Sequence, residues 1–132
     1  MRIALLFTLA AALALPTASS AKRDNLTDEA RLAKALDGLT PGKPQSCINL
    51  REAQQTEAYG DSVLFTVGRK LVYKTESKGC GNRGSDTFVT RTIGTQLCRG
   101  DVIERVDLLS GMRSGFCIAG DFTPYKAVKQ QP

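Results

Sequence analysis

Four cysteines are the feature that most limits what this chain can fold into. Cys47, Cys80, Cys98 and Cys117 are widely spaced, and no two of them are close neighbours in the chain. A structural zinc site usually draws its ligands from closely spaced pairs, so this spacing argues against a bound metal. An even number of cysteines in a small exported domain instead predicts two disulfides.

The pairing of these cysteines is open at this stage, because four cysteines allow three pairings. We expect Cys47 to bond Cys117 and Cys80 to bond Cys98, since the first bond would tie together the two ends of the domain. Each bond would stabilise the fold by about 3 to 4 kcal/mol in the chain-entropy model.

The N-terminal residues predict export, which is what makes disulfides chemically reasonable. Arg2 provides a basic start, residues 3–15 an apolar centre, and Ser19 and Ala21 the small residues that a signal peptidase requires. The apolar centre is too short for a membrane anchor. We therefore expect residues 1–21 to be a signal peptide cleaved after Ala21, and the mature protein to be periplasmic or secreted, soluble, and without a membrane span.

The mature chain begins with a predicted helix and a linker, over residues 22–44. Residues 26–37 suit a short helix, which Asn25 or Thr27 can cap, and Leu32, Leu36 and Leu39 form an apolar stripe at helical spacing. We expect this stripe to pack on the domain, and a partner-binding helix is the alternative. Two prolines and a glycine within residues 39–44 end the helix and predict a linker.

A single β-rich domain is predicted over residues 45–128, followed by a tail at 129–132. Its short segments are rich in β-branched and aromatic residues, and turn residues such as Gly60-Asp61 and those at 68–70 separate them. The predicted strands are 47–50, 56–59, 62–67, 71–76, 87–93, 102–108 and 116–122. The fold class is mainly β: a small antiparallel β-barrel or sandwich of about six to seven strands, stapled by disulfides, with one short N-terminal helix.

Residues 101–110 fit two kinds of structure. Asp101 and Glu104 form a capping-box pattern, and Val102, Ile103 and Val106 would share one face of a helix. A strand is the preferred prediction, because the segment is rich in β-branched residues and residues 110–115 would then form a hairpin loop.

The chain contains no histidine, and this excludes most hydrolytic mechanisms. Triads with an imidazole base and histidine-ligated catalytic metals are ruled out, and cysteines held in disulfides cannot act as nucleophiles. We predict no catalytic residue, no metal and no cofactor, and hence no enzyme. The alternative is a small envelope glycan hydrolase that uses paired carboxylates. Its acids would come from Asp86, Asp101, Glu104, Asp107 and Asp121.

Residues 79–84 match the G-x-G-x-x-G pattern of dinucleotide-binding loops. That chemistry needs a helix after the loop, so that a phosphate can bind at the helix N-terminus. Here a strand-like segment follows instead. The pattern is therefore interpreted as a glycine-rich turn around a disulfide, without a cofactor.

Basic residues gather in the middle of the chain, which carries a formal net charge of +5. If they share one face of a sheet, they would form an anion-binding surface. The candidate residues are Arg69, Lys70, Lys74, Arg83 and Arg91. An anionic glycan or an envelope protein would be a suitable partner, whereas a nucleic acid is not expected for an exported domain of modest charge.

Residues 42–48, 91–98 and 115–125 resemble a family of uncharacterised small exported proteins of alphaproteobacteria, especially sphingomonads. The resemblance implies a periplasmic location and brings no catalytic residue. The functional hypothesis is thus an exported, non-enzymatic domain that binds a partner or an anionic ligand, or supports the cell envelope.

Overall fold

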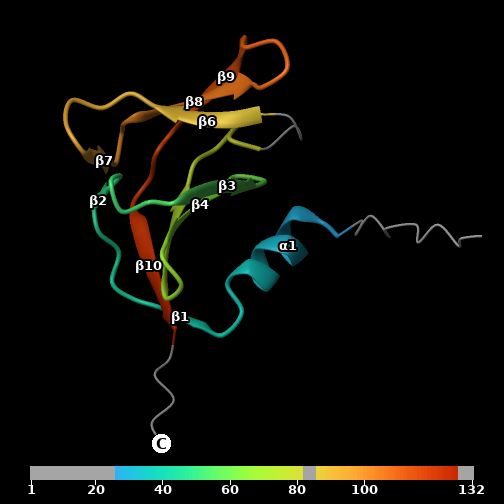
Figure 1. Ribbon diagram of the computed structural model, residues 1–132. Helices are drawn as coiled ribbons and strands as arrows, with labels where there is room; N and C mark the ends of the chain where they lie inside the picture. Colours follow the sequence, from blue (N-terminus) through green and yellow to red (C-terminus); the bar gives the residue numbers. More distant parts are fainter. Residues whose placement is uncertain (1–25, 82–85, 128–132) are drawn as a thin grey trace, which may run out of the picture.

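The computed structural model describes residues 26–81 and 86–127, which form ten strands and one helix (Figure 1). The strands lie in antiparallel sheets, so the predicted mainly β, antiparallel class is confirmed. The sheets do not close into a barrel, and there are more strands than the six to seven expected. The predicted signal peptide, Arg83 and the tail at 129–132 lie outside the described residues.

The largest sheet has five strands in the order β1-β10-β5-β4-β3. Both predicted hairpins are present in it: Tyr59 pairs with Ser62 across the first, and Val67 pairs with Leu71 across the second. Gly60 and Gly68 turn these hairpins with φ of 57° and 60°, a conformation that glycine adopts without strain. The strands are β1 Leu39–Pro41, β3 Gln55–Tyr59, β4 Ser62–Val67, β5 Leu71–Glu76 and β10 Phe122–Ala127.

Two smaller sheets complete the fold. One has the order β6-β8-β9, from Asp86–Thr90, Val102–Asp107 and Arg113–Ile118, and the other pairs β2, Cys47–Asn49, with β7, Gln96–Cys98. The predicted strand at 101–110 is therefore confirmed as β8. Figure 1 shows the β8–β9 hairpin at the top of the view, with its loop extending away from the other sheets.

The core is built from side chains of all three sheets. Phe65 of β4 and Phe122 of β10 are almost fully buried, with ring centroids 6.0 Å apart in an edge-to-face arrangement. Leu97 of β7 and Ile103 of β8 are completely buried against the same cluster. Each sheet thus contributes one apolar face, as expected for packed β layers.

The predicted strand at 116–122 covers only the end of β9 and the first residue of β10, because the chain changes sheets within it. β9 ends at Ile118 and β10 begins at Phe122. Between them, a Cβ on Gly120 would lie only 2.6 Å from the backbone oxygen of Glu76, so only glycine fits where the chain crosses. The pattern of residues shows no clear sign of this crossing, because apolar residues occupy 116–119 without a break and Phe122 follows soon after.

Three strands were absent from the sequence-based prediction. One is β10, of which only Phe122 lies in a predicted strand. β1 lies within the predicted linker and pairs with β10, and β7 pairs with β2. β1 and β7 each have three residues, which is too short to display a period of two.

The predicted disulfide pairing is wrong. Cys47 bonds Cys98, and Cys80 bonds Cys117. Cys47 and Cys98 stand directly opposite each other in the β2–β7 ladder, with their Cα atoms 4.0 Å apart. The register of the β2–β7 ladder therefore decides the Cys47–Cys98 bond, and not the distance of the cysteines from the ends of the domain.

The helix α1, Asp28–Ala35, is capped by Thr27, whose hydroxyl accepts a hydrogen bond from the Ala30 N–H at 3.3 Å. No residue of α1 is fully buried, although Leu32, Leu36 and Leu39 are half-buried. The predicted stripe thus packs loosely on the domain. No helix within residues 26–81 and 86–127 is long and apolar enough to cross a membrane.

Candidate functional site

The predicted basic residues are distributed over two sheets. Arg69 and Lys70 lie in the β4–β5 turn, and Lys74 lies on β5 with its ammonium 2.6 Å from the Glu76 carboxylate. Arg91 follows β6 in the three-stranded sheet and pairs with Glu104. Arg83 lies outside the described residues. Lys74 is thus paired within its own strand, and Arg91 contacts Glu104 through its Nε atom.

Each of the five acids considered for a carboxylate pair has a partner within the chain. Asp86 faces Arg105, Asp101 accepts from the Cys98 N–H, Glu104 faces Arg91 and Arg113, Asp107 accepts from the Ser110 N–H, and Asp121 faces Arg99. Asp86 and Asp107 stand opposite each other in the β6–β8 register. Their contacts differ, however: Asp86 faces a buried cation, and Asp107 accepts hydrogen bonds from the β8–β9 loop.

A buried ion pair connects the three strands of the β6-β8-β9 sheet. The side chains of Arg105 and Asp86 are 9% and 2% exposed, with Nη1 3.6 Å from Oδ2. Nη1 also donates to the Gly81 carbonyl at 2.7 Å, and Nη2 donates to the Ser114 carbonyl at 3.3 Å. A Cβ on Gly115 would overlap the guanidinium, so the glycine allows Arg105 to lie against β9. Because these contacts face the interior of the protein, the Arg105–Asp86 pair has a structural role.

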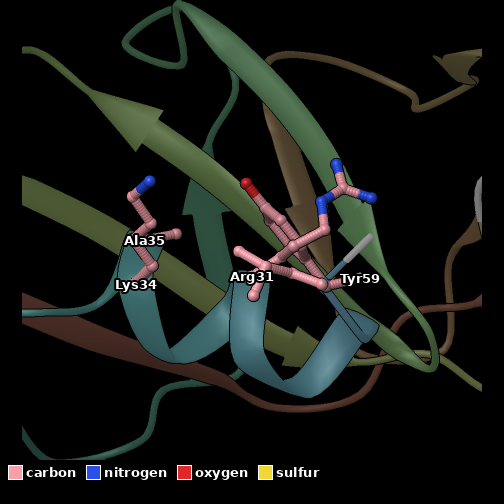
Figure 2. A pocket seen from close by; sticks show the side chains of 5 residues that line it. Arg31, Lys34, Ala35 and Tyr59 are labelled. Carbon is pink, nitrogen blue, oxygen red and sulfur yellow. The ribbon is translucent and has the colours of Figure 1, made fainter. Parts of the chain in front are cut away.

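A shallow pocket of about 260 Å³ lies between α1 and β3. Leu26, Arg31, Lys34, Ala35 and Tyr59 line it. Figure 2 shows Arg31 beside Tyr59, and its guanidinium carbon is 5.2 Å from the ring centroid. The Tyr59 hydroxyl donates to the Glu57 carboxylate at 2.5 Å. These contacts bind the helix to the sheet, and they leave two solvated cations in a shallow hollow.

Tyr59 provides a pH-dependent test of its own burial and of its hydrogen bond to Glu57. Burial of the phenol, with the hydrogen bond to Glu57, raises the pKa of Tyr59 from 10.0 to about 12. Between these pH values the unfolded chain releases this proton and the folded chain keeps it, so stability falls as the pH rises from about 10 to about 12. Subtracting the absorbance titration of Tyr59→Phe from that of the wild type should isolate an ionisation near 12. A difference curve centred at 10 would contradict the burial of Tyr59 and its hydrogen bond to Glu57, since Arg31 lowers this pKa.

The second pocket is a groove on the solvent side of the β6-β8-β9 sheet. Residues alternate along β8, so that Ile103 and Arg105 face the core while Val102 and Glu104 face outward. The register places Ile118 opposite Val102 and Phe116 opposite Glu104. The groove has a volume of about 500 Å³. We define the outer face as Val102, Glu104, Arg113, Phe116 and Ile118.

Exposed apolar side chains are concentrated on this hairpin. Eight large apolar side chains are exposed among the described residues, and six of them belong to β8, β9 or their loop. Those six are Val102, Leu108, Leu109, Met112, Phe116 and Ile118. Isolated exposed apolar residues are common on proteins, but a contiguous apolar surface usually marks a binding site.

Three charged groups form a compact cluster beside the apolar residues. Oε2 of Glu104 lies 3.3 Å from Nε of Arg91 and 3.4 Å from Nε of Arg113. The Glu104 side chain is only 14% exposed, whereas Arg91 and Arg113 are 68% and 65% exposed. The carboxylate therefore lies beneath two guanidinium groups that face solvent.

Sequence reasoning noted Arg91 and Glu104 but missed the apolar part of the outer face. A signal was present, because Phe116, Cys117 and Ile118 are consecutive apolar residues. In a half-buried strand, neighbouring residues face opposite sides, so a cysteine bonded in the core requires Phe116 and Ile118 to face outward.

The outer face is the candidate functional site, because it combines an apolar groove with exposed cations. The interior ion pair and the hollow beside α1 are explained by folding contacts. Neither protein-family models, nor curated proteins, nor solved structures produce a match to this chain.

Proposed function

We propose that this protein is an exported, non-enzymatic domain that binds a partner protein of the cell envelope through its outer face. Two disulfides suit an oxidising compartment, in agreement with the predicted signal peptide. The observation that carries the proposal is the groove of about 500 Å³ on the outer face, which the exposed side chains of Val102 and Phe116 line.

The physical reason is the cost of keeping such a surface in water. Phe116 is 68% exposed, and Val102 and Ile118 beside it are 41% and 46% exposed. Burying apolar surface contributes roughly 25 cal/mol per Å², so a partner that covers these side chains gains affinity. Aromatic side chains near the centre of an interface often provide much of the binding energy. Phe116 is the natural anchor of this surface.

A protein partner fits these residues better than the two other candidates. An anionic glycan would need a continuous basic surface, but Arg69, Lys70 and Lys74 lie on a different sheet from Arg91. A glycan hydrolase would need two acids free to act on a sugar, whereas the candidate acids have partners inside the protein.

Capture from an envelope extract by the mature, oxidised protein tests the proposal. We expect a partner that the wild type retains, and we expect Phe116→Ser to reduce its recovery by about tenfold, because this change removes the central apolar contact. The matched control is Leu26→Ser, which removes an exposed apolar side chain next to α1.

The control should retain the partner like the wild type. If Phe116→Ser and Leu26→Ser retain it equally well, or if both lose it equally, the outer face is not the binding surface. Circular dichroism of both variants should match the wild type, because both side chains are exposed.

A further inference from the structure

The geometry points to the chemistry of the partner: the outer face takes an extended protein segment in which an apolar side chain adjoins a carboxylate. This inference rests on the proposed function and adds the type of ligand to it. It depends on three properties of the outer face, namely its charge, its unused hydrogen-bond donors and the position of its apolar groove.

The charge of the cluster favours an acidic ligand. Arg91 and Arg113 contribute two positive charges and Glu104 one negative charge, which leaves one net positive charge. The carboxylate is mostly covered, and both guanidinium groups are largely exposed. An approaching ligand therefore meets positive charge first, and complementary charge increases both the association rate and the specificity of binding.

The donors of the two arginines fit a carboxylate. Each arginine uses its Nε atom toward the same oxygen of Glu104. Within the described part of the chain, no hydrogen bond or ion pair engages the Nη atoms of Arg91 or Arg113. Guanidinium groups with unused N–H donors bind carboxylates through charge-assisted and often bidentate hydrogen bonds.

The apolar groove and the cations are next to each other. Val102, Arg113 and Phe116 line the same groove of about 500 Å³. Phe116 stands directly opposite Glu104 in the β8–β9 register. A ligand whose apolar side chain covers Phe116 thus has its neighbouring residue close to Arg113. The required pattern is one apolar residue with an acidic residue beside it.

The segment is expected to lie across the sheet face and not to extend the sheet at β9. The β8–β9 register shifts between Arg105 and Val106, and Arg113 pairs with Val106 while Gly115 pairs with Arg105. This bulge leaves Ser114 as an extra residue and disrupts regular pairing at one end of the strand. Such irregular edges resist the addition of another strand.

A second copy of this chain is a poorer occupant. A symmetric dimer places the same surface on both sides of the interface. Two outer faces would then bring two net positive charges together in a desolvated contact, which is unfavourable. A separate partner with an acidic segment has no such conflict.

The test uses two fluorescein-labelled peptides of equal length, each with a central Phe-Leu pair. Glutamates flank the pair in one peptide and lysines flank it in the other. We expect the wild type to bind the acidic peptide about tenfold more tightly in fluorescence polarisation, and this preference should weaken as salt is added.

Charge reversal at Arg113 should reverse the preference. Arg113→Glu should favour the basic peptide, whereas the control Arg51→Glu, with the same change of charge at an exposed residue after β2, should keep the wild-type order. Phe116→Ser should weaken the binding of both peptides. Equal binding of the two peptides by the wild type, or an unchanged preference in Arg113→Glu, would overturn the inference.

The outcomes separate this inference from the proposed function. If Phe116→Ser loses the envelope partner while Arg113→Glu keeps the acidic preference, the binding surface stands and the ligand chemistry is wrong. If Phe116→Ser keeps the partner, the proposed function itself fails. A dimer in light scattering that dissociates in Phe116→Ser would show that a second copy occupies the outer face, and would overturn the inference.

Discussion

Replacing Asp86 with alanine should lower the free energy of unfolding by about 3 to 5 kcal/mol, because the Arg105 guanidinium would stay buried without a counter-charge. Both side chains are at least nine-tenths buried, and Arg105 also holds the Gly81 and Ser114 carbonyls. It therefore cannot move into solvent without breaking contacts to two other segments. Urea unfolding followed by circular dichroism measures the loss.

A surface pair offers the matched control. Arg99 and Asp121 also form an ion pair, at 3.3 Å, but their side chains are 63% and 47% exposed. Asp121→Ala should cost less than about 1 kcal/mol, because solvent screens an exposed pair and hydrates the remaining charge. If Asp86→Ala and Asp121→Ala lower the free energy of unfolding equally, the buried Asp86–Arg105 pair contributes no more to stability than a surface ion pair.

A double variant separates the loss of charge from the loss of contact. Replacing Asp86 with alanine and Arg105 with methionine removes both buried charges, and it should recover much of the stability that the single change loses. A double variant as unstable as Asp86→Ala would mean that the hydrogen bonds of Arg105 to β9 and Gly81 matter more than its charge.

Removing either disulfide should cost about 4 kcal/mol, the second large effect that we expect. The sequence separations are 51 for Cys47–Cys98 and 37 for Cys80–Cys117. Because loop entropy grows slowly with loop length, the stabilisation from the two disulfides should differ by only about a few tenths of a kcal/mol. Side-chain packing should therefore decide which disulfide costs more stability when it is removed. Cys80 and Cys117 are buried in the core and Cys47 and Cys98 are half-buried, so Cys80→Ala with Cys117→Ala should be the more damaging change.

Guanidinium unfolding of the two double variants gives this comparison, with the oxidised wild type as reference. Mass spectrometry of a digest without reductant should find the peptides of Cys47 and Cys98 linked, and those of Cys80 and Cys117 linked. A linked pair containing Cys47 and Cys117 would contradict the register of the β2–β7 ladder.

Much of the secondary structure could be predicted because it depends on local patterns. The strands at 62–67 and 71–76 have the bounds that the sequence predicted, with one turn before the first at Gly60 and one between the two at Gly68. Short segments rich in β-branched and aromatic residues and bounded by glycine need no distant partner to be recognised. The helix was predicted for a similar reason, because Thr27 caps it and acids occupy its first turn.

The outer face and the adjoining Arg91 were less accessible to prediction, because they bring together β8, β9 and the residue after β6. Arg91 and Glu104 were noted separately, one as a basic residue and the other as an acid. They meet because β6 pairs with β8, and Arg113 joins them because β9 pairs with the other edge of β8. The predicted hairpin loop at 110–115 indicated that β8 and β9 are neighbours, but no pattern along the chain shows that β6 pairs with β8.

The sequence by itself determined that this chain is mainly β and crosslinked, and that imidazole chemistry is absent, because these properties follow from which residues are present and from their nearest neighbours. Tertiary structure alone decided the pairing of the cysteines, the change of sheet at Gly120 and the exposure of Phe116. These three depend on strand register, which long-range packing selects. A shift of one residue would reverse the face that each side chain occupies.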